Sequence, residues 1–121
     1  DELLPLCVER GIAIVLGGVM NSGILAQPGA GGHFDYRPAD AARVERARRL
    51  EAVCARHGVS LKAAAIQFPL AHPAVASLVA GVRRVAHLDD YPAMMRQAID
   101  PDLWTELRSD GLIAPDAPTP T

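Results

Sequence analysis

The sequence predicts an α/β fold in which parallel strands alternate with helices. Two short runs, 12–16 and 75–79, are apolar on both faces, which is typical of strands buried in a parallel sheet. Stretches with apolar residues at helical spacing lie before, between and after these runs, and strands separated by helices pair in parallel. Because two strands cannot complete a parallel sheet, we expect its N-terminal remainder to lie outside these 121 residues.

The composition is that of an ordinary globular domain. Hydrophobic residues make up 50% and charged residues 21% of the chain. The formal net charge of −2 argues against a nucleic-acid-binding protein, which would carry a strongly basic face. No apolar segment is long enough to cross a membrane. Cys7 and Cys54 form no CxxC pair and are interpreted as small buried hydrophobic residues, so we expect a cytoplasmic protein and no metal site.

The first elements are a helix, a strand and a long loop. Apolar residues recur at helical spacing over positions 3–8, and Gly11 predicts the end of that helix. The first strand follows over 12–16. The loop from 21 to 38 is rich in glycine, and long loops in compact domains are often functional.

A pair of helices separates the two strands. Asp40 is expected to cap the first helix, which runs to about Arg56 and whose arginines favour a solvated face over a phosphate site. Its apolar stripe consists of Val44, Ala47, Leu50 and Cys54. Ser60 is expected to cap the second helix, which Pro69 should stop at about Phe68.

Two further helices follow the second strand. One should begin near Val85, and Pro92 either kinks it or starts a new turn capped by Asp90. Asp100 followed by proline opens the last helix, with an inward face of Leu103, Trp104 and Leu107. Residues 114–121 are rich in proline and are predicted to be disordered, so the domain is expected to span 1–113.

The segments that follow the two strands carry the candidate binding residues. The first strand leads into 17–25, which is rich in small residues, and the second leads into 80–84. In a β/α barrel the site is built from loops at the C-terminal ends of the strands, and loops after strands seven and eight commonly hold a phosphate. Small residues let backbone N–H groups approach a phosphate, and a helix N-terminus adds positive potential.

Three stretches in a characteristic order resemble the aldo-keto reductase family. They are 15–25, 65–75 and the Trp104 helix that ends at 111–113, and they are most similar to its aldose (galactose, fucose, threo-aldose) 1-dehydrogenase branch. The resemblance implies that this chain is the C-terminal portion of a TIM-type (β/α)8 barrel. It would contain about strands seven and eight with their flanking helices.

The resemblance also implies an NAD(P)-dependent oxidoreductase that oxidises an aldose sugar at C1 or reduces a carbonyl. The family's catalytic Asp, Tyr, Lys and His lie in the first half of the barrel, so we expect no catalytic residue here and no activity from this chain alone. The alternative is a non-enzymatic barrel remnant or interaction module that pairs its strand edges with another chain. Unpaired apolar edges also predict self-association of the isolated chain.

The family's cofactor contacts can be matched to this sequence by position. The segment after strand seven, which wraps the pyrophosphate of NADP or NAD, corresponds here to Gly18, Val19, Met20, Ser22 and Leu25. The segment after strand eight, which meets the adenosine, corresponds to Gly81, Val82, Arg83, Arg84, His87 and Asp90. Two positions differ from the family pattern. Gly17 stands where many relatives have a tyrosine that stacks on the nicotinamide, and Tyr91 stands where they usually have an asparagine beside the adenine.

Three polar residues of the long loop present another possibility. His33, Asp35 and Tyr36 could form an acid/base group, although loop packing or a lid on the substrate side is the preferred interpretation. His57 is interpreted as a helix C-terminal residue favoured by the macrodipole, and His72 as structural.

Overall fold

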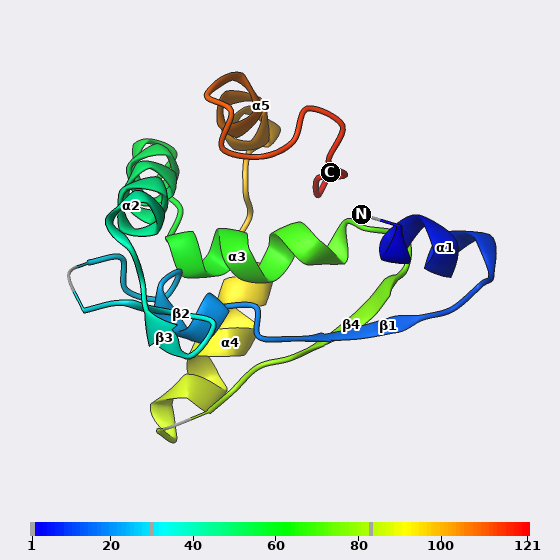
Figure 1. The fold of residues 1–121 in the computed structure, drawn as a ribbon, viewed down its shortest axis with the longest axis horizontal. Helices are drawn as coiled ribbons and strands as arrows, with labels where there is room; N and C mark the ends of the chain where they lie inside the picture. Colours follow the sequence, from blue (N-terminus) through cyan, green and yellow to red (C-terminus); the bar gives the residue numbers. More distant parts are fainter. Residues whose placement is uncertain (1, 30, 83) are drawn as a thin grey trace.

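The computed structural model describes residues 2–29, 31–82 and 84–121. It confirms an α/β chain with parallel strands: β1 (Ile14–Gly17) and β4 (Val75–Val79) pair in parallel in a two-stranded sheet. The register is irregular after Ile14 and then pairs Gly17 with Val79, so both strands end at the same edge (Figure 1).

The predicted helices are present in the described part of the chain. They are α1 (Leu3–Glu9), α2 (Ala41–Arg56), α3 (Leu61–Leu70), α4 (Ala86–Arg96) and α5 (Pro101–Ser109). Three predicted caps are confirmed, because the side chains of Asp40, Ser60 and Asp100 each accept a hydrogen bond from a backbone N–H in the first turn of α2, α3 and α5.

Two prolines, Pro69 and Pro92, lie beyond the first turn of their helices. The expectation that Pro69 stops α3 at Phe68 is wrong, because the helix continues to Leu70. Pro69 lies in the last turn of α3, where it removes one helical hydrogen bond. The preceding turn is stabilised by burial of Ile66, which is 2% exposed. Pro92 likewise lies within a single helix, α4, which has no buried residue.

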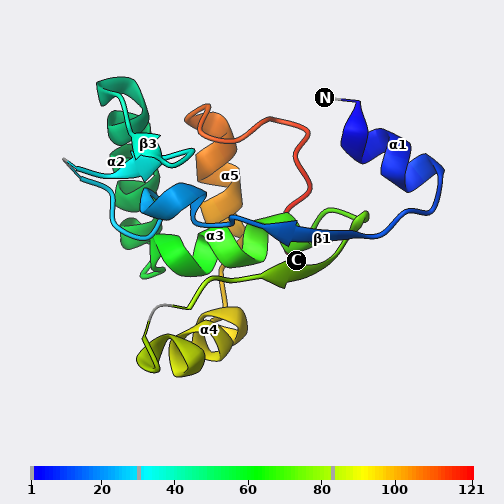
Figure 2. The ribbon, with the colours of Figure 1, turned by 60° about the horizontal axis from the view of Figure 1, so that its bottom comes forward.

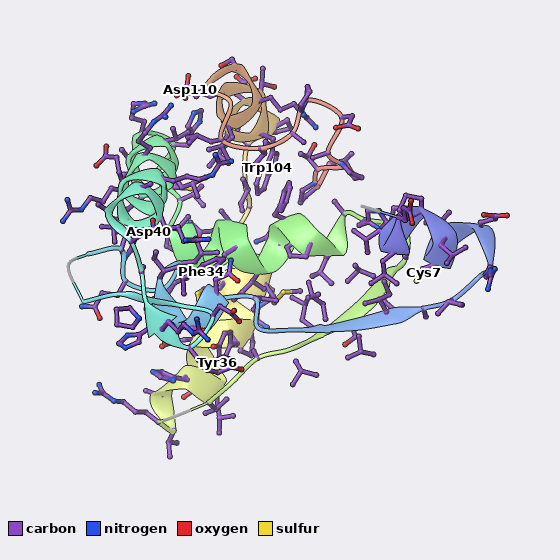
Figure 3. All side chains as sticks on the ribbon, viewed as in Figure 1. Cys7, Phe34, Tyr36, Asp40, Trp104 and Asp110 are labelled. Atoms are coloured by element: carbon purple, nitrogen blue, oxygen red, sulfur yellow. The ribbon has the colours of Figure 1, made fainter. Side chains whose placement is uncertain are left out.

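The hydrophobic core lies among α2, α3 and α5. Trp104 points from α5 toward α3, where its ring stacks on Phe68 with 5.8 Å between ring centres (Figure 3). Cys54 and Leu103 have no exposed surface. Both cysteines are buried and unpaired, as predicted, and burial raises the pKa of the Cys54 thiol to about 11. The core also contains Val53, Val59, Leu61, Ala63, Ala64, Leu107 and Leu112.

The sheet lies to one side of this core. α3 contacts β4 and also reaches α4, where Gln67 Nε2 donates to the carbonyl oxygens of Met94 at 2.7 Å and Gln97 at 2.8 Å. α1 lies at the opposite end of the molecule from α2 (Figure 2). The expectation that both strands are buried on both faces is wrong for this chain, because Val15 is 62% and Val79 61% exposed. Neither strand has a further neighbour within the described residues.

A short hairpin occupies the long loop after β1, where the sequence predicted no strand. β2 (His33–Phe34) and β3 (Arg37–Pro38) pair antiparallel, and the turn residues Asp35 and Tyr36 adopt φ values of 50° and 60°. Ahead of it lies the 3-10 helix η1 (Asn21–Gly23). No helix in the described ranges is long and apolar enough to cross a membrane.

The end of the chain contacts α5. Arg108 Nη2 donates to the carbonyl oxygen of Ala117 at 2.9 Å and to Thr119 Oγ1 at 2.8 Å. The domain boundary at residue 113 and the disorder of residues 114–121 stay predictions.

Candidate functional site

The two candidate binding segments leave the sheet side by side. β1 and β4 run in the same direction and Gly17 pairs with Val79, so the loop after β1 and the loop after β4 begin at one edge (Figure 1). The two groups of candidate residues selected from the sequence therefore lie on segments that the fold brings together. In parallel sheets this edge, outside the carboxyl ends of the strands, is where ligands bind.

The loop after β1 is a compact turn with an exposed surface. Gly18 has φ 71°, and its carbonyl oxygen accepts from the N–H of Asn21 at 2.8 Å. Val19 and Ile24 anchor the turn by burial, at 9% and 3% exposed. Of the other candidates here, Gly18 and Ser22 are exposed, and Met20 and Leu25 are half-buried. The exposed surface of this turn therefore consists largely of backbone atoms.

Ser22 connects this turn to the hairpin. Its Oγ accepts a hydrogen bond from the backbone N–H of Tyr36 at 2.9 Å. Ser22 itself has φ 60°, a left-handed conformation that few non-glycine residues adopt. The hairpin is thus fixed to the loop that carries the first group of candidate residues.

The loop after β4 and the first turns of α4 carry the other candidates. Gly81, Val82, Arg84 and Asp90 are exposed, and His87 is half-buried on the first turn of α4. Arg83 lies outside the described residues. The Tyr91 hydroxyl donates to the carbonyl oxygen of Gly81 at 3.0 Å. Sequence reasoning noted Tyr91 only as a departure from the family pattern and missed this hydrogen bond.

The hairpin packs against the start of α2. The Arg43 guanidinium lies 4.5 Å from the centre of the Phe34 ring and pairs with Asp40, beside a hollow of about 220 Å³. Tyr36 is 90% exposed and projects from the hairpin (Figure 3). Within the described part no hydrogen bond joins the side chains of His33, Asp35 and Tyr36. The acid/base interpretation of these three residues gains no support from this arrangement.

The arginines of α2 bind the end of α5. Arg46 Nη2 donates to the carbonyl oxygen of Leu112 at 2.7 Å, and Arg49 Nη2 donates to that of Asp110 at 3.1 Å. Arg56 pairs with Glu106. The face that carries Arg46 and Arg49 is exposed, as expected, and these two side chains also bind backbone acceptors that follow α5. Arg46 and Arg49 thus pair with carbonyl groups just beyond the last residue of α5, at the negative end of the helix.

Two histidines also have structural partners. His57 Nε2 lies 2.6 Å from Glu106 Oε2, and His72 Nδ1 accepts from the backbone N–H of Ala74 at 3.2 Å. No group of three or more His, Cys, Asp or Glu side chains in 2–29, 31–82 and 84–121 could hold a metal ion.

Residues 1–109 match the sequence profile of the Aldo/keto reductase family. The chain belongs to this family. It is 46% identical over 114 residues to a pyridoxal 4-dehydrogenase of Microbacterium luteolum, covering 93% of this chain and 33% of that protein. It is 40% identical over 121 residues to a D-threo-aldose 1-dehydrogenase of a Pseudomonas species, covering 98% of this chain and 36% of that protein. The chain thus spans about a third of the length of these relatives.

Membership of the aldo/keto reductase family confirms the resemblance inferred from the three sequence stretches. Proteins of this family are oxidoreductases that typically use a nicotinamide cofactor. A mixed α/β chain with parallel strands is consistent with part of the family's barrel.

Proposed function

We propose that this chain supplies the pyrophosphate- and adenosine-binding loops of an NAD(P)-dependent oxidoreductase. In this proposal β1 and β4 are strands seven and eight of the barrel, and the chain is its C-terminal part. The observation that carries the proposal is the parallel pairing of Gly17 with Val79, which starts both loops at one edge in a chain of this family. We call the whole barrel that contains this chain the complete protein.

The turn after β1 has the features of a pyrophosphate site. In the described residues, the backbone N–H groups of Val19 and Met20 donate to no protein acceptor. They follow Gly18, whose positive φ turns the chain at the end of β1. Adjacent N–H groups in such turns form concave sites for anions. Because both NAD and NADP carry the pyrophosphate, this contact would serve either cofactor.

The loop after β4 suits the adenosine end. Arg84 is exposed beside the N-terminus of α4, and no side chain caps that helix. An uncapped helix N-terminus carries partial positive charge, and a guanidinium group can bind a phosphate through charge-assisted hydrogen bonds. The 2′-phosphate that distinguishes NADP from NAD would lie here, with His87 and Asp90 nearby on α4.

The substrate would be a small compound with a hydroxyl or carbonyl group. The two relatives are named for oxidation of pyridoxal at position 4 and of a D-threo-aldose at C1. We infer oxidation of an aldose at C1 or reduction of a carbonyl, in which the bound cofactor gives or takes the hydride. This chain's residues bind and orient the cofactor, and the catalytic Asp, Tyr, Lys and His would come from the remainder of the complete protein.

Cofactor binding by the complete protein tests this function. Calorimetric titration with NADP and NAD should show binding of both, and Gly18→Ala should weaken both alike because the pyrophosphate is common to them. Gly18 has φ 71° and open space around it, so the added methyl group strains only the backbone. In the free protein, alanine lets this turn relax to a negative φ, and binding must restore the positive φ at a cost of about 1–2 kcal/mol, which corresponds to a roughly 5- to 30-fold loss of affinity.

Gly29→Ala is the matched control for this experiment. A Cβ added at Gly29 also meets open space, and Gly29 has no positive φ, so the affinities should stay unchanged. Failure of the unaltered protein to bind either cofactor would refute the proposed function. An unchanged Gly18→Ala protein would remove the turn after β1 from the site.

One observation favours the second candidate, a barrel remnant that acts by association. Val15 and Val79 expose apolar surface on the same sheet, and α1 exposes Leu3 at 68% and Val8 at 48%. Such surface is typical of a chain that packs against another polypeptide. The two candidates differ in cofactor binding, which an association module does not need.

A further inference from the structure

Tyr91 connects α4 to the loop from which that helix emerges. Its side chain is half-buried, and its hydroxyl donates to the carbonyl oxygen of Gly81 at 3.0 Å. Gly81 lies two residues beyond the end of β4, ten residues before Tyr91. The hydrogen bond therefore closes a ring of chain around the start of α4, and it is a contact through which the helix can set the position of the loop.

The described residues of the loop have little packing of their own to hold it. Val82 is 45% and Val85 80% exposed, and no atom lies within 4 Å of the place where a Cβ on Gly81 would be. The first turn of α4 has no side-chain cap. A loop with exposed side chains and open space around its glycine depends on specific hydrogen bonds for a defined conformation.

We propose that Tyr91 is a positioning residue for the adenosine site and that its hydroxyl favours NADP over NAD. The inference rests on the proposed function. By holding the Gly81 carbonyl group, the hydroxyl fixes the direction in which the chain leaves β4. Arg84 is joined to the first turn of α4, because its carbonyl oxygen accepts from the N–H of His87 at 3.0 Å. The Tyr91 hydroxyl therefore sets where Arg84 and the N-terminus of α4, the two groups proposed to read the 2′-phosphate, lie relative to the end of β4.

The effect should be selective between the two cofactors. A ligand gains affinity when the protein groups that bind it are already ordered, because their ordering then costs less on binding. NADP uses Arg84 through its 2′-phosphate, whereas NAD has no phosphate there. Loss of the Tyr91 hydroxyl should therefore weaken NADP binding and leave NAD binding almost unchanged.

Tyr91→Phe in the complete protein tests the first step, that the hydroxyl holds the loop. Phenylalanine keeps the ring and removes only the donor. Without cofactor, amide hydrogen exchange over residues 81–86 should become roughly three- to tenfold faster, the range expected for one hydrogen bond. Tyr36→Phe is the matched control, because Tyr36 is 90% exposed and lies in the hairpin, and it should leave exchange over 81–86 unchanged.

Cofactor titration of the same variant tests the second step. The Kd for NADP should rise roughly three- to tenfold while that for NAD changes less than about twofold. At saturating cofactor kcat should stay at the unaltered value, because the reacting groups are not touched. A purely structural residue would instead affect both cofactors and kcat together.

Three results would overturn the proposal, and they are distinguishable. Unchanged hydrogen exchange would show that Tyr91 does not hold the loop. Faster exchange with both affinities unchanged, or equally reduced, would show that the loop's position does not select NADP. Absence of cofactor binding in the unaltered protein would refute the proposed function and this role with it, while the exchange measurement would still report whether the hydroxyl orders the loop.

Discussion

The imidazole Nε2 of His57 lies 2.6 Å from the carboxylate Oε2 of Glu106, and this contact joins the C-terminus of α2 to α5. Arg56 Nε donates to the other carboxylate oxygen at 2.9 Å. The hydrogen bond from Arg56, followed by that from His57, holds the pKa of Glu106 below its ordinary value of 4.5. The folded chain therefore favours the ionised carboxylate.

Acidification should weaken the contact between α2 and α5. A carboxyl group whose pKa is lower in the folded state stabilises the fold above its unfolded pKa and loses that contribution as the pH falls through the folded value. Urea unfolding of the complete protein between about pH 6 and pH 3 should show a decline in stability below pH 4.5 that Glu106→Gln reduces. Glu45→Gln, on the exposed face of α2, should retain the decline. Equal pH dependence of the three proteins would contradict the assignment.

Truncation of Leu103 should destabilise the fold more than truncation of an exposed leucine. Leu103 has no exposed surface in the core among α2, α3 and α5, so Leu103→Ala should lower the free energy of unfolding by about 2–5 kcal/mol. Leu88→Ala, at a residue 58% exposed on α4, should change it by no more than about 0.5 kcal/mol. Urea unfolding followed by circular dichroism measures both. Similar losses would mean that the core is not where the structure places it.

The isolated 121-residue chain should self-associate. Val15 and Val79 expose apolar surface, and the sheet has unpaired edges within the described ranges. Sedimentation velocity at several concentrations should show oligomers, and Val79→Lys should reduce them. Val85→Lys places the same charge on a residue that is 80% exposed but outside the sheet, and should reduce them less. A monodisperse monomer with a cooperative thermal transition would count against this expectation.

Arg84→Ala in the complete protein should discriminate between the two cofactors. A charge-assisted hydrogen bond to a phosphate contributes about 1.5–3 kcal/mol, so NADP affinity should fall roughly ten- to a hundredfold. NAD, which lacks the 2′-phosphate, should bind nearly as before. Arg48→Ala, on the exposed side of α2, is the control. Equal weakening of both cofactors would give Arg84 a role in holding the loop, and no change would place the adenosine elsewhere.

The isolated chain should not oxidise sugars. Proton transfer and hydride alignment need the catalytic groups that we assign to the remainder of the complete protein. The purified chain is incubated with an aldose and either oxidised cofactor. The absorbance of the reduced nicotinamide should not increase beyond that of a buffer blank. The complete protein, assayed in parallel, is the positive control. Turnover by the isolated chain that a substitution within it abolishes would locate catalytic residues here.

The sequence was informative about the helices because their ends depend on neighbouring residues. Asp40, Ser60 and Asp100 each lie just before an apolar periodic segment, and a capping side chain reaches only two or three residues ahead. The end of α3 was predicted wrongly because the cost of a proline depends on its place in the helix. Pro69 lies near the C-terminal end, where few helical hydrogen bonds follow it. The hairpin was missed because Asp35 and Tyr36 adopt positive φ without a glycine to indicate it.

The sequence was sufficient to predict which segments form the candidate site. It was not sufficient to predict the hydrogen bonds within that site. Small residues after each strand indicate where a backbone can approach a ligand, so the loops after β1 and β4 could be selected from the sequence. The hydrogen bond between Ser22 and Tyr36 spans 14 residues, and that between Tyr91 and Gly81 spans 10. Neither has a local pattern. The hydrogen bonds of Arg46 and Arg49 were missed for the same reason, since the carbonyl groups that follow α5 become their neighbours only in the folded chain.

The placement of the core among the helices, away from the strands, has a consequence for assembling the barrel from two pieces. Cys54 and Leu103 are fully enclosed within this chain, while Val15 and Val79 are not. The α2, α3 and α5 bundle can thus keep its shape before β1 and β4 find neighbours. A gene split just ahead of this chain would then yield a C-terminal partner that docks in trans through its sheet. Restoration of activity on co-expression of the two halves would provide a complementation reporter.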